Sequence, residues 1–176
     1  MKIEVKEEFM ETSSGKKYPF TIVIDSREQK PFFFDECEIN VKALKTGDYS
    51  IKGYEDEISL ERKTLVDFVH SIIQDRDRFE REILRAKKTL KYFAIIVETD
   101  FKSLWTAKLF SKVNRATIEN TILRWSVKYG IPIIPVGTRA KGKHAVLQLF
   151  DEWVKCHTLP YYMDIFNQAY NTEVTT

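Results

Sequence analysis

Three ionisable side chains on two adjacent segments could bind a cation and cut a phosphodiester bond. Residues 47–54 (G-D-Y-S-I-K-G-Y) and 57–63 (E-I-S-L-E-R-K) have the pattern of two strands joined by a short turn, which predicts a β-hairpin. In the resulting register Asp48 falls opposite Glu61, and Lys63 lies two residues farther along the same face. One face of the hairpin therefore gathers two acids and a lysine, while its other face is apolar.

Facing carboxylates repel each other unless a positive charge lies between them. Because hard divalent cations prefer oxygen ligands, Asp48 and Glu61 with a few waters suit Mg²⁺ or Mn²⁺. Lys63 could then orient or deprotonate a water, since the ion and partial burial would lower its pKa. The arrangement predicts metal-dependent phosphodiester cleavage. The alternative is a solvated charge run, and a one-residue slip of the hairpin would separate the two acids.

The surrounding pattern predicts the elements that would position these groups. Besides the hairpin, the expected strands are 20–25, 39–44, 92–99 and 131–136, and the expected helices are 65–73, 76–91, 115–129 and 143–157. Thr64 is the expected N-cap of the first helix, and Asp67 lies in its first turn, where a negative charge is favourable. Antiparallel strands come first and strands alternate with helices later. This order predicts an α/β fold with a mixed β-sheet flanked by α-helices.

A longer series of motifs extends beyond the hairpin. The series is V-I-D-S-R-E at 23–28, G-D-Y at 47–49 and L-E-R-K-T-L-V-D at 60–67. It resembles the nuclease domain of the XPF family of structure-specific endonucleases, a branch of the restriction-endonuclease-like fold. The resemblance covers residues 20–99 well and 100–157 more weakly. It implies an XPF-type nuclease domain over 19–158, with an N-terminal arm at 1–18 and a C-terminal tail at 159–176.

The resemblance also implies roles for individual residues. Glu28, Asp48 and Glu61 match the family's metal ligands for Mg²⁺ or Mn²⁺, with the backbone carbonyl of Arg62 as a fourth, and Lys63 matches the catalytic lysine. The other matched positions, which shape the site or meet the scissile phosphate, are Asp25, Arg27, Arg62 and Asp67. For the two arginines the alternative is a role as ion-pair partners of the acids. For Asp67 the alternative is a charge that stabilises a helix N-terminus.

The implied activity is endonucleolytic cleavage of branched, flapped or fork DNA during repair, recombination or replication. A non-catalytic DNA-binding or partner subunit on the same fold is the alternative. The protein could form a homodimer or pair with a heterologous subunit. Cleavage that depends on Mg²⁺ would distinguish the enzyme from the binding module.

Two basic segments are candidate DNA contacts. The candidates on the helix 76–91 are Arg76, Arg78, Arg81, Arg85 and Lys88, and those on the segment 138–144 (T-R-A-K-G-K-H), expected to be a loop, are Arg139, Lys141 and Lys143. Contacts of these side chains with DNA phosphates would make binding sensitive to salt. The alternatives are a solvated helix with ion pairs such as Asp77–Arg81 and an ordinary surface loop.

Composition limits the other possibilities. The net charge is only +2, so DNA affinity would have to come from a local basic patch. No apolar run approaches the roughly 18 residues of a membrane span, and the N-terminus lacks the apolar segment of a signal peptide. The two cysteines, Cys37 and Cys156, have no paired spacing, which is typical of a reducing, intracellular setting. We therefore expect an intracellular protein that has DNA as its partner and no contact with a membrane.

Overall fold

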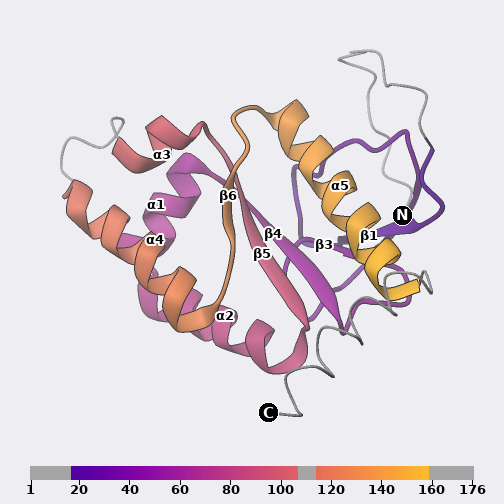
Figure 1. The fold of residues 1–176 in the computed structure, drawn as a ribbon, viewed down its shortest axis with the longest axis horizontal. Coiled ribbons are helices and arrows are strands. Elements are labelled where there is room, and N and C mark those ends of the chain that lie inside the picture. The colour runs from indigo at the N-terminus through magenta and orange to yellow at the C-terminus, as the bar shows by residue number, and fades with distance from the viewer. Residues whose placement is uncertain (1–16, 107–113, 159–176) are drawn as a thin grey trace, which may run out of the picture.

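The computed structural model describes residues 17–106 and 114–158, in which helices pack against a central β-sheet (Figure 1). The strands are β1 (Thr21–Asp25), β2 (Glu38–Lys42), β3 (Tyr49–Ile51), β4 (Ile58–Thr64), β5 (Tyr92–Glu98) and β6 (Ile133–Pro135). The helices are α1 (Leu65–Ile73), α2 (Arg76–Thr89), α3 (Phe101–Thr106), α4 (Arg115–Tyr129) and α5 (Arg139–Thr158). The predicted C-terminal tail, and all but the last two residues of the predicted N-terminal arm, lie outside the described residues.

The sheet is mixed, as the sequence predicted. Within the described residues six strands form one sheet in the order β2-β1-β3-β4-β5-β6. β3 is antiparallel to β1 and to β4, whereas β1 runs parallel to β2, and β4, β5 and β6 run parallel to one another. The parallel run β4-β5-β6 follows from the helices between its strands, which return the chain to the same end of the sheet. The carboxyl ends of β4 and β5 therefore meet at one edge.

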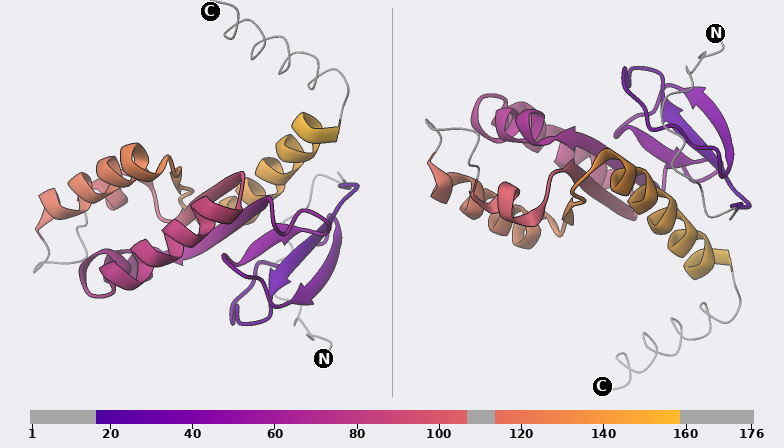
Figure 2. Two further views of the ribbon diagram at one scale, coloured as in Figure 1. Left: turned by 90° about the horizontal axis from the view of Figure 1, so that it is seen from below. Right: turned by 90° about the horizontal axis from the view of Figure 1, so that it is seen from above.

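Two hydrophobic cores lie on opposite faces of the sheet. Ile95 and Val97 of β5 pack in a core with α1, α2 and α4, whereas Ala94 and Ile96 pack in a second core with α5. Successive side chains of a strand point to opposite faces, so a strand covered on both sides has a continuous apolar sequence. Figure 2 shows α5 apart from the group formed by α1, α2 and α4.

The β3–β4 hairpin has the register predicted from the sequence. Tyr49 pairs with Leu60, and the backbone N–H of Asp48 donates to the carbonyl of Leu60 at 2.8 Å. Gly47 precedes this pair with a φ of 78°, and a Cβ there would lie 2.2 Å from Ser59 Oγ. Only glycine accepts both that backbone conformation and that close approach. The glycine before Asp48 is thus what lets the two strands come together beside the acid.

The start of α1 confirms a prediction, whereas the start of α5 corrects one. Thr64 caps α1, with its Oγ1 accepting from the N–H of Asp67 at 3.2 Å, as predicted. Helix α5 begins at Arg139, whereas the sequence analysis placed a loop at 138–144, and that prediction was wrong. The reason is tertiary: at Gly142 the helix passes so close to Phe32 that a Cβ would lie 2.8 Å from the ring. A glycine that signals a loop in the sequence here lets a helix pack closely.

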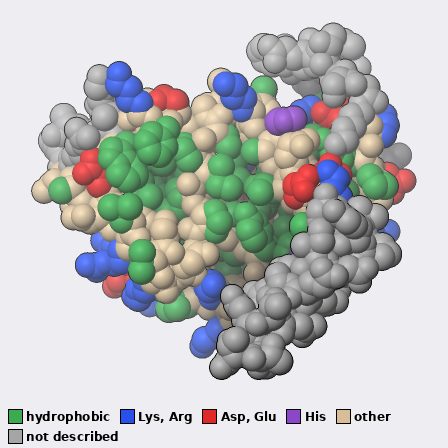
Figure 3. Space-filling view, in the orientation of Figure 1, with side chains coloured by type: hydrophobic (Ala, Val, Ile, Leu, Met, Phe, Trp, Pro, Cys, Tyr) green, Lys and Arg blue, Asp and Glu red, His purple; other side chains and the backbone are tan. Residues whose placement is uncertain are grey.

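One part of the surface is hydrophobic. Figure 3 shows hydrophobic side chains gathered over α4 and along β6. On α4, Leu123 and Val127 are 54% and 89% exposed.

Within the described parts of the chain, no helix combines the length and the apolar character needed to cross a bilayer.

Candidate active site

The motif residues converge on one pocket at the end of the sheet. Its volume is about 450 Å³. It is lined by Asp25, Arg27, Glu28, Gln29, Lys30, Gly47, Asp48, Glu61, Arg62, Lys63, Thr64, Asp67 and Glu82. These side chains come from the end of β1, the loop after it, the start of β3, the end of β4, the first turn of α1 and the middle of α2. The pocket thus brings together every residue that the sequence placed in a catalytic or metal-binding role.

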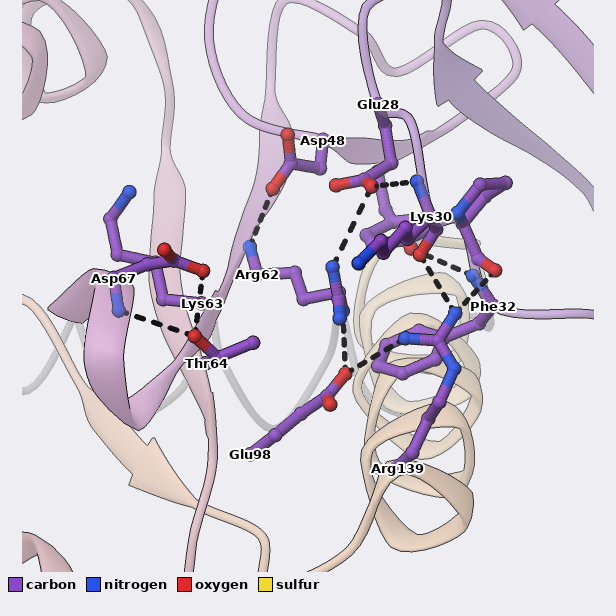
Figure 4. Close-up of polar contacts among 12 residues, drawn as sticks. Glu28, Lys30, Phe32, Asp48, Arg62, Lys63, Thr64, Asp67, Glu98 and Arg139 are labelled. Carbon is purple, nitrogen blue, oxygen red and sulfur yellow. Dashed lines mark hydrogen bonds and ion pairs between the residues drawn. The ribbon is translucent and has the colours of Figure 1, made fainter. Parts of the chain in front are cut away.

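Two facing acids give the pocket an excess of negative charge. Burial and the nearby carboxylate of Glu61 raise the pKa of Asp48 to about 8. Burial also raises the pKa of Glu61, which is 7% exposed. One carboxylate oxygen of Asp48 accepts from the backbone N–H of Arg62 at 2.7 Å, which aligns it with the end of β4 (Figure 4). A cation between the two carboxylates would relieve this repulsion.

Lys63 occupies the positive position next to these acids. Its Nζ donates to Glu61 Oε1 at 2.9 Å and lies 4.4 Å from the centre of the Phe79 ring. Burial acts to lower the pKa of Lys63, but the charge and hydrogen bond of Glu61 outweigh burial and raise it. The sequence analysis expected a lowered pKa in the presence of an ion. In the structure the lysine is instead held charged by its carboxylate partner.

Glu28 and Arg62 meet on the opposite side of the pocket. Glu28 accepts from the backbone N–H of Lys30 at 2.6 Å and lies 3.6 Å from Arg62 Nη1. Arg62 also donates through Nε to Glu98 Oε1 at 2.5 Å, and its side chain is only 9% exposed. The guanidinium is therefore enclosed between two acids. This geometry fits the ion-pair alternative for Arg62.

Asp25 fixes the start of the loop that follows β1 through its ion pair with Arg27. Arg27 donates to both carboxylate oxygens of Asp25, at 2.8 and 2.9 Å, and to the carbonyl of Leu44 at 2.7 Å. The N–H of Leu44 donates to Asp25 at 2.6 Å. Burial acts to raise the pKa of Asp25, but the hydrogen bonds from Arg27 and Leu44 outweigh it and lower the pKa. This ion pair ties the end of β1 to the segment that leads to β3.

Asp67 takes part in the cap of α1 while also lining the pocket. Thr64 Oγ1 donates to Asp67 Oδ2 at 2.6 Å and accepts from the N–H of the same residue (Figure 4). The structure thus contains the helix-terminal charge that the sequence offered as the alternative. The same carboxylate remains available to the pocket.

The carboxylates have the right chemistry for a hard divalent cation but are not assembled around one. Among residues 17–106 and 114–158, no three His, Cys, Asp or Glu side chains converge closely enough to hold a metal ion as they lie. Each expected ligand has another partner: Glu61 contacts Lys63, Asp48 contacts the backbone of Arg62, and Glu28 contacts the backbone of Lys30. Because these are flexible acidic side chains lining one pocket, rotation could direct their oxygens to a common ion.

Comparison with known protein families matches the sequence around this pocket to a described domain. The sequence model of the ERCC4 domain matches residues 24–147, which include all the predicted catalytic and metal-binding residues. The chain belongs to the ERCC4 domain family. The ERCC4 domain here is 32% identical over 120 residues to a putative ATP-dependent RNA helicase of Methanocaldococcus jannaschii. That alignment covers 67% of this chain but only 14% of the relative, so the chain corresponds to a small part of it.

Solved structures show the same fold for this ERCC4 domain. XPF from Aeropyrum pernix in a complex with DNA matches with a TM-score of 0.62 at 21% identity, covering 80% of this chain and 67% of that chain. XPF from the same organism without DNA matches with a TM-score of 0.61 at 21% identity, covering 76% and 60%. The prediction of a mixed sheet flanked by helices with the XPF nuclease fold is therefore confirmed.

Two acids of the ERCC4 domain site escaped the sequence analysis. Glu98 is the last residue of the buried strand β5, and because β4 and β5 are parallel, Glu98 pairs in register with Thr64 at the same end of the sheet. Because parallel neighbouring strands end together, the position of Glu98 at the end of a predicted strand could have indicated that it lies near the site. Glu82 lines the pocket from α2, and its charge helps to raise the pKa of Lys63. No role for Glu82 was predicted from the sequence.

The candidate DNA contacts of the ERCC4 domain differ in their surroundings. Arg76 lies 3.1 Å from Glu80 and Thr121, and Arg78 lies 2.7 Å from Asp75. The exposed members of the set are Arg78, Arg81, Arg85, Lys88, Arg139 and Lys141, whereas Arg76 and Lys143 are half-buried. Lys143 pairs with Asp35 and Glu36, and Arg139 contacts Glu98 together with two backbone carbonyls.

Proposed function

We propose that this ERCC4 domain is a divalent-cation-dependent endonuclease that cuts DNA. One observation carries the proposal: Asp48 faces Glu61 in a pocket with Lys63 within 2.9 Å of the second acid. The pKa of Asp48, raised to about 8 by burial and by Glu61, marks a concentration of negative charge that a cation would relieve. Glu28, from the neighbouring loop, supplies a third carboxylate.

The proposed roles follow from the donors in the pocket. Glu28, Asp48 and Glu61, with the backbone carbonyl of Arg62, would hold Mg²⁺ or Mn²⁺. Such an ion stabilises the negative charge that develops on a phosphodiester during cleavage. Lys63, whose Nζ is paired with Glu61, would orient the attacking water.

The proposed substrate is branched, flapped or fork DNA inside the cell, in repair, recombination or replication. Membership of the ERCC4 domain family and the similarity in fold to an XPF structure containing DNA support a DNA substrate. The exposed Arg81, Arg85 and Lys88 on α2 are the proposed phosphate contacts of this helix. The exposed Lys141 on α5 adds a further positive charge.

A cleavage panel tests this activity. Flap, fork, four-way-junction and plain duplex DNA are incubated with the protein in Mg²⁺, in Mn²⁺ and in EDTA. We expect cutting of branched DNA with either ion and none in EDTA. Lys63→Ala should lower the rate at least about 100-fold, and Asp48→Asn should also abolish cutting. Arg124→Ala, on the exposed surface of α4, is the matched control. Cutting that persists in EDTA, or that proceeds at the wild-type rate in Lys63→Ala, would reject the proposed chemistry.

The second candidate function is a non-catalytic DNA-binding or partner subunit. It is favoured by one observation: within the described residues, the acids are not assembled around an ion. The same panel separates the two functions. Tight binding of branched DNA with no cutting in Mg²⁺ or Mn²⁺ would establish the binding module and reject the enzyme.

A protein partner is also part of the proposal, either a second copy of the chain or a different subunit. Leu123 and Val127 lie one turn apart on α4 and are 54% and 89% exposed. Exposed apolar side chains gathered on one face are typical of a protein interface. A measurement of molecular mass in solution tests for the homodimer. The variant Val127→Lys should convert such a dimer to monomers.

A further inference from the structure

Arg139 joins three segments that are far apart in the sequence. It is the first residue of α5, and its Nη1 lies 3.1 Å from Glu98 Oε1 at the end of β5. Its Nη2 donates to the carbonyls of Lys30 and Pro31, at 2.7 and 2.6 Å. These two carbonyls belong to the loop that carries Glu28. Figure 4 shows the guanidinium of Arg139 directed toward this loop and toward Glu98.

The loop is also held at the next residue, Phe32. The N–H of Phe32 donates to the hydroxyl of Tyr49 at 2.9 Å, and the two rings stack with centroids 5.4 Å apart. Arg139 lies 4.9 Å from the centre of the Phe32 ring, and Gly142 leaves room for that ring against α5. The loop that carries Glu28 is thus gripped between α5 and β3, and β3 begins next to Asp48.

Glu98 connects these contacts of the loop to the pocket. Its Oε1 accepts from Arg139 and from Arg62 Nε, at 3.1 and 2.5 Å. Arg62 in turn reaches Glu28 through Nη1 at 3.6 Å. The series Arg139–Glu98–Arg62–Glu28 therefore runs from the start of α5 to one of the proposed cation ligands. Because both Nη atoms of Arg139 make these contacts, its guanidinium is directed toward the protein rather than toward a DNA phosphate.

We propose that Arg139 is a positioning residue, which fixes the Glu28 loop and the Arg62 side chain so that Glu28 can bind the divalent cation. This role replaces the DNA contact that the sequence suggested for Arg139. The inference rests on the proposed metal-dependent nuclease. Residues that orient ligands without touching the ion commonly change metal affinity about 10- to 100-fold when replaced.

The test measures Mn²⁺ affinity without DNA, by electron paramagnetic resonance of the free ion, in the full chain. Arg139→Ala should weaken Mn²⁺ binding at least about 10-fold. Arg139→Lys keeps the charge but offers its donors from a single nitrogen instead of a planar fork, so it should recover only part of the affinity. Arg124→Ala is the control for replacing an exposed arginine and should bind Mn²⁺ like the wild type. In cleavage assays, raising Mn²⁺ should restore the kcat of Arg139→Ala, with an unchanged KM for DNA.

Two further measurements separate the alternatives. DNA affinity is measured in EDTA over a range of salt. Weaker DNA binding by Arg139→Ala, with a salt slope smaller by about one and unchanged Mn²⁺ affinity, would identify a phosphate contact and overturn the inference. If Arg139→Ala does not fold by circular dichroism, Glu98→Gln replaces it and should show the same loss of Mn²⁺ affinity. If Mn²⁺ binding survives in Glu98→Gln, the inference fails. If the wild type binds no Mn²⁺, the proposed nuclease fails as well.

Discussion

Asp48 lies opposite Glu61 across the β3–β4 hairpin, because Tyr49 and Leu60 are directly paired in the next position. The two carboxylates share one pocket, and burial together with this proximity raises the pKa of Asp48 to about 8. The two facing carboxylates suit a cation, but without one their repulsion lowers the stability of the folded protein. Stability and the proposed function therefore act in opposite directions at this site.

The first prediction is that Asp48→Asn stabilises the protein in EDTA. The folded state keeps the Asp48 proton up to about pH 8, while the unfolded state releases it near 3.8. The unfolded state therefore binds fewer protons between these values, so stability falls as pH rises through that window. Asparagine removes this loss, and its oxygen can still accept from the N–H of Arg62. We expect a gain of about 1–2 kcal/mol at pH 8 and little gain at pH 4.

Urea unfolding in EDTA at both pH values measures this gain. A benefit of Asp48→Asn that is equal at the two pH values would contradict the assigned cause. Adding Mn²⁺ should stabilise the wild type but not the variant, which links the result to the proposed ligand role.

The second prediction concerns Glu80, which joins α2 to α4. It accepts from Tyr129 Oη at 2.6 Å and from Trp125 Nε1 and Arg76 Nε, each at 3.1 Å. Burial acts to raise the pKa of Glu80, but hydrogen bonds from Tyr129, Trp125 and Arg76 outweigh it and lower the pKa to about 2. The stabilisation is fully present above the usual value of 4.5 and is lost as pH falls through about 2.

Glu80→Gln should therefore cost about 1–2 kcal/mol at neutral pH, and the cost should shrink below pH 4.5. Urea unfolding of wild type and variant over this pH range measures it. Glu152→Gln is the control, because Glu152 is 57% exposed in its ion pair with Lys155 and should contribute little. A cost for Glu80→Gln that stays constant down to pH 2.5 would reject the ionic origin.

The third prediction is that Gly47→Ala destabilises the hairpin much more than Gly53→Ala. Both glycines have positive φ, at 78° and 91°. A Cβ on Gly47 would meet Ser59 Oγ at 2.2 Å, whereas a Cβ on Gly53 would meet open space. We expect about 3 kcal/mol for Gly47→Ala and about 1 kcal/mol for Gly53→Ala, the latter from backbone strain alone. Equal losses in chemical unfolding would show that close contact contributes nothing at residue 47.

The fourth prediction separates the arginines of α2. Arg85 is exposed, and Arg85→Ala should weaken DNA binding for all sequences and lower the salt slope by about one. Arg76 is held by Glu80 and Thr121, so Arg76→Ala should lower stability and leave the salt slope unchanged. Fluorescence anisotropy with labelled fork DNA over a range of salt gives both slopes. A slope reduced in Arg76→Ala and unchanged in Arg85→Ala would reverse the assignment.

Much of the sheet could be predicted because its signals are local. The alternation of residues 47–54 and 57–63 with a turn between them sets the hairpin register, and Tyr49 does pair with Leu60. Thr64 is followed by a helical period, and it caps α1 as expected. These features depend on neighbours in the chain. The same is true of the buried run of β5.

The links between distant segments could not be predicted in the same way. Arg139 and the loop at residues 30–31 are more than 100 positions apart, and nothing local to either indicates their contact. The start of α5 depends on the close packing of Gly142 against Phe32, so a local pattern of glycine and lysine gave the wrong structure there. The resemblance to a family supplied Glu28, which no spacing within the hairpin indicates.

The ion pair between Lys63 and Glu61 has a consequence for how the proposed enzyme would be loaded. The ammonium group already neutralises one of the carboxylates, so it acts as a tethered counterion that an incoming Mg²⁺ must displace. Loading is then an exchange of one positive charge for another, and the cation affinity is set by the difference between the two. Lys63 would thus be free for the chemistry only where a cation has taken its place beside Glu61.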